Sequence, residues 1–146
     1  IVIWNVYKGR IVSTLTGHEK PIWALVLHDK NILISGSFDS TIKIWDLDYA
    51  KCLRSLNEQD GAIYSLIANR KGELFSGSED RLIRVWNIET GKCFKTLEGH
   101  ITIVCKFAIT SEDFLISSSF DSSIKLWNTD SGECMRTINI GNTFSW

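Results

Sequence analysis

The sequence predicts an all-β protein assembled from repeated four-stranded antiparallel sheets, and three observations support this. The segment SGSFDSTIKIWD at 35–46 returns forty-one residues later as SGSEDRLIRVWN at 76–87, and again as SSSFDSSIKLWN at 117–128. One tryptophan recurs at the same interval, as Trp4, Trp45, Trp86 and Trp127. Each interval holds four short strand-like segments separated by turn residues, and none shows helical periodicity.

The repeat gives the expected elements in order. The chain is treated as one continuous array with a partial repeat at 1–16, complete repeats at 17–56, 57–97 and 98–138, and the start of another at 139–146. The partial repeat supplies strands at 1–4 and 10–15. The complete repeats supply strands at 21–28, 32–37, 41–45 and 51–56; at 62–68, 73–78, 82–86 and 92–97; and at 102–109, 113–119, 123–127 and 133–138.

A four-stranded repeat of this length is the size of one propeller blade. The glycine–serine strand, the turn aspartate and the closing tryptophan–aspartate of 35–46 resemble the WD-repeat (WD40) family, and the likeness spans nearly the whole chain. The resemblance implies a β-propeller, with about three and a half of about seven blades in this chain. Because the chain begins within a repeat and without Met, we expect a piece of a longer propeller protein. A ring formed by two self-associating copies is the alternative.

The composition disfavours several functions. The 17 acidic and 16 basic residues are interspersed, which leaves no basic face for nucleic acid or an anionic membrane. The apolar runs are too short for a membrane-spanning helix, and no signal peptide opens the chain. Cys52, Cys93 and Cys134 occupy equivalent positions one repeat apart, too distant to pair, and no CxxC spacing indicates zinc. We therefore expect reduced thiols, a cytoplasmic or nuclear location, and neither metal nor other cofactor.

A buried indole needs a hydrogen-bond acceptor for its N–H group. The family resemblance implies the acceptor, a serine on the adjacent strand, which is linked through a histidine to the turn aspartate. The second repeat departs from this pattern because glutamine replaces the histidine, so we expect a weaker or differently wired network there. The expected members are His18, Ser35, Asp39 and Trp45; Gln59, Ser76, Asp80 and Trp86; and His100, Ser117, Asp121 and Trp127.

The same histidine, serine and aspartate could also suggest a catalytic triad. Nucleophilic catalysis needs an exposed serine hydroxyl, an oxyanion site and a cleft. Here the set recurs in the repeats and ends on an indole that we expect to be buried, which favours a structural hydrogen-bond relay. The sequence also contains no GxSxG, Walker lysine loop, HExxH or GxGxxG motif. We predict that the protein is not an enzyme and has no catalytic residues.

Aromatic residues occupy turns that would ordinarily be polar. Phe38 and Phe120 precede the turn aspartate, and Glu79 stands there in the second repeat. The family resemblance implies that this position and two others, at the start of the innermost strand, line the narrow top face where peptides dock. One innermost-strand position is occupied by Trp23, Tyr64, Cys105 and Trp146. The other, two residues earlier, is occupied by Pro21, Ala62, Ile103 and Phe144. The predicted partner-binding residues are Trp23, Phe38, Tyr64, Glu79, Ile103, Phe120, Phe144 and Trp146.

These positions also restrict the ligand. No arginine occupies any of them, which disfavours a reader of phosphopeptides. An aromatic rim with Glu79 suits an apolar or cationic side chain, such as arginine or lysine in a peptide. The alternative is that Trp23 and Tyr64, or the two phenylalanines, only pack between blades. We predict a non-catalytic scaffold that binds proteins or peptides; a substrate-recruiting module of an F-box ubiquitin ligase and an enzyme on a propeller frame are the other hypotheses.

Overall fold

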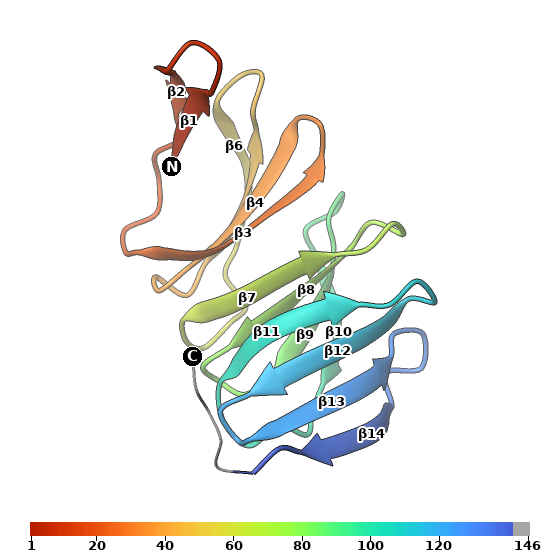
Figure 1. Ribbon diagram of the computed structural model, residues 1–146. Helices are drawn as coiled ribbons and strands as arrows, with labels where there is room; N and C mark the ends of the chain where they lie inside the picture. The colour runs from red at the N-terminus through yellow and green to blue at the C-terminus, as the bar shows by residue number, and fades with distance from the viewer. Residues whose placement is uncertain (142–146) are drawn as a thin grey trace.

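The computed structural model describes residues 1–141, which form fourteen strands in four antiparallel sheets (Figure 1). These residues contain no helix of the length and apolar character that a membrane span requires. The partial sheet pairs β1 (Val2–Asn5) with β2 (Arg10–Thr14). The three complete blades are β3 (Ile22–Asp29), β4 (Ile32–Ser37), β5 (Ile42–Asp46) and β6 (Lys51–Leu56); β7 (Ile63–Ala68), β8 (Glu73–Ser78), β9 (Ile83–Asn87) and β10 (Cys93–Leu97); and β11 (Val104–Ile109), β12 (Phe114–Ser119), β13 (Ser123–Asn128) and β14 (Cys134–Asn139). The all-β prediction is confirmed.

The blades meet through their first strands and diverge toward their last. β3 and β4 contact β7, and β7 and β8 contact β11. Figure 1 shows β3, β7 and β11 on the inner side of the array, with β14 at the far edge of the third blade. Burial follows this order: β8 is buried at every residue after its first, whereas β14 is exposed along its whole length. This fan of sheets around their inner strands is the arrangement of propeller blades.

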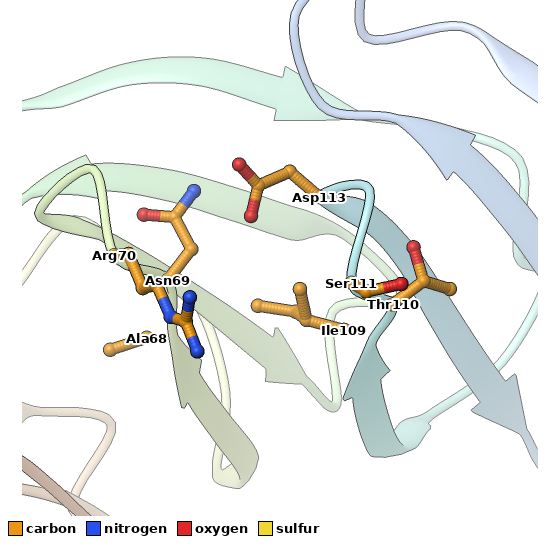
Figure 2. Close-up of a pocket in the computed structure, with 7 residues that line it drawn as sticks. All are labelled: Ala68, Asn69, Arg70, Ile109, Thr110, Ser111 and Asp113. Atoms are coloured by element: carbon orange, nitrogen blue, oxygen red, sulfur yellow. The ribbon is translucent and has the colours of Figure 1, made fainter.

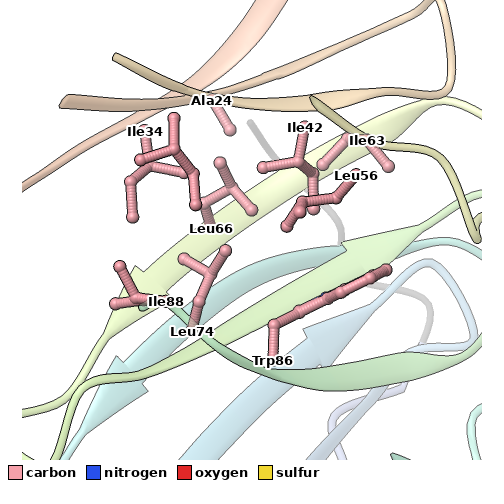
Figure 3. Packing of buried hydrophobic residues seen from close by; sticks show 10 residues of the cluster. Ala24, Ile34, Ile42, Leu56, Ile63, Leu66, Leu74, Trp86 and Ile88 are labelled. Atoms are coloured by element: carbon pink, nitrogen blue, oxygen red, sulfur yellow. The ribbon is translucent and has the colours of Figure 1, made fainter. Parts of the chain in front are cut away.

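The hydrophobic core lies between adjacent blades. Figure 3 shows Ile34 and Ile42 of the first blade above Leu74 and Trp86 of the second. The second interface repeats the pattern, with Phe75, Ile83 and Val85 packed against Val104, Leu115 and Trp127. Each buried side chain of this size stabilises the fold by about 1.5–3 kcal/mol. Because both faces of the middle blade are covered, its strands carry apolar residues on both sides.

Two glycines allow the close approach of neighbouring blades. A Cβ atom on Gly36 would lie 2.5 Å from Cγ2 of Ile63, and one on Gly77 would lie 2.9 Å from both Val104 and Phe107. Contacts this short require the neighbour to move, so only glycine fits these positions on β4 and β8. The equivalent residue on β12 is Ser118.

The partial sheet differs from the others in burial. Leu15 is buried, and its backbone exchanges hydrogen bonds with Ile1 at 2.8 and 2.9 Å. Trp4 occupies the repeat position of Trp45, yet 56% of its surface is exposed, against 1% for Trp45. In the described residues β1 pairs with β2 alone, whereas β5, which carries Trp45, lies between β4 and β6.

Candidate functional site

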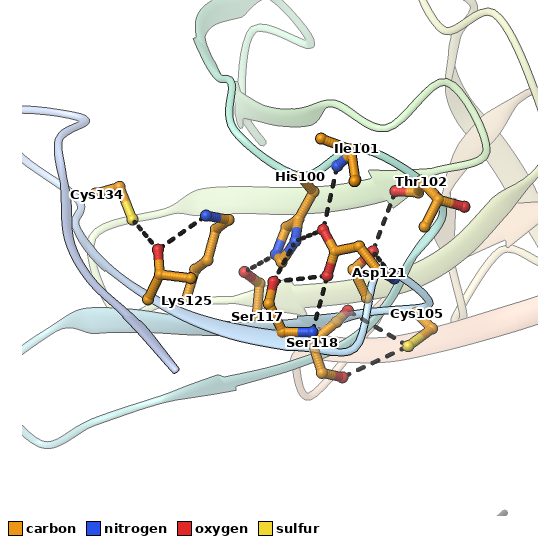
Figure 4. Close-up of polar contacts among 12 residues, drawn as sticks. His100, Ile101, Thr102, Cys105, Ser117, Ser118, Asp121, Lys125 and Cys134 are labelled. Carbon is orange, nitrogen blue, oxygen red and sulfur yellow. Dashed lines mark hydrogen bonds and ion pairs between the residues drawn. The ribbon is translucent and has the colours of Figure 1, made fainter. Parts of the chain in front are cut away.

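A relay of four side chains locks the third blade, and Figure 4 shows its members His100, Ser117 and Asp121. The indole Nε1 of Trp127 donates to Oγ of Ser117 at 2.8 Å, and this hydroxyl lies 2.7 Å from Nε2 of His100. His100 Nδ1 lies 2.8 Å from a carboxylate oxygen of Asp121. These contacts fit a neutral imidazole that carries its proton on Nδ1 and accepts the serine proton at Nε2. Burial accordingly lowers the pKa of His100, although Asp121 opposes the shift.

The aspartate of the relay also holds the turn after β12. Asp121 receives the Ser123 hydroxyl at 2.6 Å and the backbone N–H groups of Ser123 and Ile101 at 2.9 and 3.1 Å. Burial alone would raise the pKa of this carboxyl group, but the hydrogen bonds from Ser123, His100 and Ile101 outweigh it and lower the pKa to about 2. The carboxylate therefore ties the loop before β11 to the turn between β12 and β13.

The first blade repeats this relay almost atom for atom. His18 lies 2.7 Å from Ser35 and 2.8 Å from Asp39, and Trp45 donates to Ser35 at 2.8 Å. Thr41 donates its hydroxyl to Asp39 at 2.6 Å, as Ser123 does to its aspartate. Burial would raise the pKa of Asp39, but the bonds from Thr41, Glu19 and His18 lower it.

The second blade is wired differently. Trp86 donates to Ser76 at 2.8 Å, and the Gln59 amide also donates to that hydroxyl, which leaves the buried Oε1 of Gln59 without a hydrogen-bond partner. Asp80 instead pairs with the guanidinium of Arg84 at 2.5 Å. Leu82 stands where the other blades have a hydroxyl. The glutamine predicts different wiring in this blade, but the role of Arg84, which replaces the lysine of the other two repeats, was not predicted.

The relay geometry does not suit nucleophilic catalysis. Ser35 and Ser117 are completely buried, and each hydroxyl already contacts an indole N–H and an imidazole. A substrate has no path to either oxygen, and each serine is held between strands of its own sheet. The arrangement fits the structural relay that the sequence favours over the triad.

The three sequence positions expected at the top face lie at one end of every complete blade. Backbone N–H groups of the turn residues donate to carbonyls at the start of the inner strand: Phe38 to Pro21 at 3.0 Å, Glu79 to Ala62 at 3.0 Å, and Phe120 to Ile103 at 3.1 Å. Each inner strand has a β-bulge where its pairing register with the next strand shifts. The bulged residues are Trp23, Tyr64 and Cys105. Bulges redirect side chains, and nothing in the sequence predicted them.

Three of the predicted residues form one aromatic cluster, Trp23, Phe38 and Tyr64. The rings of Trp23 and Phe38 stack with centroids 5.1 Å apart, and Tyr64 lies 5.3 Å from Phe38 and 6.3 Å from Trp23. Trp23 keeps 57% of its surface exposed, and the other two are half-buried. The cluster joins the first and second blades yet remains open to solvent.

Of the other predicted partner-binding residues, the structure describes Glu79, Ile103 and Phe120. Glu79 is exposed beside Tyr64, whose pKa is raised by burial and by the Glu79 charge. Phe120 and Ile103 are half-buried at the same end of the third blade. Phe144 and Trp146 lie outside the described residues.

Two hollows lie at opposite ends of the inner strands. One of about 220 Å³ lies beside the aromatic cluster, and its walls include Trp23, Leu25, Tyr64 and Lys106. The other, of about 380 Å³, lies between the turns that follow β7 and β11 (Figure 2). Its lining is polar and of mixed charge: Ala68, Asn69, Arg70, Ile109, Thr110, Ser111 and Asp113. Aromatic and aliphatic side chains border the hollow beside the cluster, whereas polar residues predominate around the other.

The fold and the repeated relay define a segment of a WD-repeat β-propeller. Comparison with known families agrees, since the family described as "WD domain, G-beta repeat" matches residues 9–46, 50–87 and 91–128. The chain belongs to the WD40 repeat family.

Solved structures show the same fold. The WD40 β-propeller domain of Doa1 superposes with a TM-score of 0.84 at 24% identity, over 92% of this chain and 46% of that one. The computationally designed Ika8 protein superposes with a TM-score of 0.84 at 31% identity, over 93% of this chain and 42% of that one. A curated relative, the periodic tryptophan protein 2 homolog of Schizosaccharomyces pombe, is 40% identical over 45 residues, which are 30% of this chain and 5% of the relative. The chain thus spans less than half the length of each.

Proposed function

We propose that this chain is a rigid, non-catalytic platform that binds protein or peptide partners at the end of the blades carrying the aromatic cluster. WD40 propellers generally mediate protein–protein interactions, and they typically serve as scaffolds without catalysis. The observation that carries the proposal is the solvent-open cluster of Trp23, Phe38 and Tyr64. Clustered exposed aromatic residues are the usual anchors of protein interfaces.

The surroundings of the cluster support a preformed site. Asp39 accepts hydrogen bonds from Thr41, from His18 and from the loop that leads into β3, so the turn bearing Phe38 is fixed. The serine relay ties the same turn to Trp45 in the blade interior. A site that is ordered before binding loses less conformational entropy when a partner docks.

A peptide-display selection on this chain tests the proposal. Random twelve-residue peptides selected for binding are measured against a double variant, Phe38→Ala and Phe120→Ala, and against Tyr49→Ala. Tyr49 is 82% exposed on the turn after β5, at the opposite end of the blades, which makes it a matched aromatic control. We expect the double variant to lose binding while its thermal unfolding midpoint stays near that of the parent. If the selected peptides bind the parent, the double variant and Tyr49→Ala equally, the proposal that this end binds partners is rejected.

A second interaction surface is proposed on the inner strand of the first blade. Leu25 is 54% exposed, whereas its repeat equivalent Leu66 is 9% exposed because the preceding blade covers it. We propose that a second copy of this chain covers β3 with one of its own blades, burying Leu25 and Leu27. Light scattering across concentrations checks this, and a stable, soluble monomer at high micromolar concentration would contradict it.

A further inference from the structure

We propose that the partner segment bound at the aromatic cluster is basic, with one lysine or arginine side chain lying against the exposed part of Trp23. The inference rests on the proposed function and names the chemistry of its ligand. Three independent features carry it: the charge of the loops around the cluster, the free surface of the indole, and the position of Glu79.

The loops at the aromatic end are strongly acidic. The segments between strands at this end are 15–21, 38–41, 57–62, 79–82, 98–103 and 120–122. They carry eight acidic residues (Glu19, Asp39, Glu58, Asp60, Glu79, Asp80, Glu98 and Asp121) and two basic ones (Lys20 and Arg81), a net charge of −6. The strand residues Lys43, Arg84 and Lys125 lie beside the turn aspartates and reduce the net charge of this end to −3. The seven turns at the opposite end carry six acidic and five basic residues, a net charge of −1.

This asymmetry selects the charge of the partner. Hydrogen bonds lower the pKa values of the two relay aspartates, so both remain ionised at neutral pH. A face with a net negative charge attracts a basic segment and repels an acidic one, and this steering weakens as salt is added. The balanced end of the blades gives no such preference.

The cluster provides a place for one cationic side chain. Phe38 covers one face of the Trp23 ring, at an interplanar angle of 15°, so the 57% of Trp23 that is exposed lies on the other face and the edges. Tryptophan is the aromatic side chain that binds cations best, at up to about 6 Å from the ring. Tyr64, edge-on to Trp23 at 70°, adds a second ring at the boundary of this surface.

Two charged side chains set where the cation lies. Glu79 is exposed beside Tyr64, and its Oε2 accepts the backbone N–H of Ala62 at 3.4 Å, which keeps the carboxylate at this end of the second blade. Lys106 lines the hollow between the inner strands, where its charge opposes a second cation. The basic side chain therefore lies at the rim, over Trp23 and toward Glu79, and not inside the hollow.

Short peptides test the charge requirement directly. The probes are acetyl-Gly-Arg-Gly-amide, its lysine counterpart, and the citrulline peptide, which keeps the shape of arginine without the charge. The indole N–H signals of the chain are followed by two-dimensional NMR, and the Trp23 signal is assigned with Trp23→Phe. We expect saturable shifts of the Trp23 signal with arginine and lysine, at least fivefold weaker binding of citrulline, and weaker binding of the charged probes at high salt. Equal binding of arginine and citrulline would overturn the inference.

Two charge variants should change the affinity for the arginine probe in opposite directions. Glu79→Gln should weaken the arginine probe about two- to fivefold, the effect of one exposed cation-binding contact. Lys106→Met should strengthen it by a similar factor. Glu89→Gln, at the opposite end of the second blade, is the matched control and should change nothing. If Glu79→Gln and Glu89→Gln behave alike, the acidic residue has no part in binding.

The outcomes separate this inference from the proposed function. If peptides selected by display require Phe38 but carry no excess of lysine or arginine, the platform stands and the basic partner is rejected. If no selected peptide depends on Phe38, the platform itself is rejected. Trp23 and Glu79 are exposed, so their variants should keep the parental unfolding midpoint, and the melting curve verifies that each variant is folded.

Discussion

Replacing Ser117 with alanine is the sharpest test of the relay that locks the third blade. The hydroxyl of this serine is the shared partner of two buried groups, the Trp127 N–H at 2.8 Å and the His100 Nε2 at 2.7 Å. Both residues are at most 6% exposed, so water does not reach them. The alanine side chain fits the same space but leaves both polar atoms without a partner.

The expected loss follows from those two orphaned atoms. Each buried polar group left without a hydrogen bond costs about 1–3 kcal/mol, so Ser117→Ala should lower the free energy of unfolding by about 2–6 kcal/mol. For a chain of this length, each 1 kcal/mol lowers the unfolding midpoint by about 3 °C, which gives a decrease of about 6–18 °C.

Differential scanning calorimetry and urea unfolding measure this loss. The matched control is Ser55→Ala on β6, whose hydroxyl contacts Lys43 and Asn57 at the surface and which should change stability by less than about 0.5 kcal/mol. A loss for Ser117→Ala no larger than that of the control would refute the stabilising role of the relay.

Three further predictions concern the blades. Trp86→Ala should cost about 3–5 kcal/mol in urea unfolding, whereas Trp4→Ala, at the same repeat position but 56% exposed, should cost less than about 1 kcal/mol; equal losses would contradict the burial pattern. The pKa of His100 lies below its ordinary value of 6.5 in the folded protein, so the unfolded chain takes up the proton first as pH falls, and stability should decrease below that pH. His100→Gln should flatten this dependence between pH 7 and 5, and an unchanged slope would exclude His100 as its source. Gly77→Ala should cost about 1–3 kcal/mol through overpacking against the next blade, and a neutral result by calorimetry would show that the neighbouring strand moves freely.

The fold could be predicted well because the same pattern of strand and turn residues recurs in three complete repeats. Every expected strand appears in residues 1–141, with ends that differ by at most two residues. Alternation along one strand is a weak signal by itself, but a tryptophan at a fixed interval fixes the register of each copy. The hydrogen bonds of the relay likewise join the residue types that the family resemblance named.

Features specific to one repeat were harder to predict. Arg84 pairs with Asp80 because Gln59 and Leu82 remove the histidine and the hydroxyl that serve the other blades, and a single sequence does not reveal which substitution compensates which. The bulges at Trp23 and Tyr64 arise from pairing between strands, which residue type does not determine. The charge difference between the two ends of the blades became visible only once the loops had been assigned to one end or the other.

The three complete repeats are not interchangeable, because two of them have glycine at the blade interface and the third has serine. Gly36 and Gly77 let the following inner strand come within contact distance of the backbone, and Ser118 fills that position on the third blade with a Cβ and a hydroxyl 3.5 Å from Cys105 Sγ. An engineered chain with these repeats in another order would therefore fold only for some orders. If the third repeat preceded the first or the second, the Ser118 side chain would overlap the inner strand of the following blade. The first and second repeats have glycine at that position, so either can be followed by another blade.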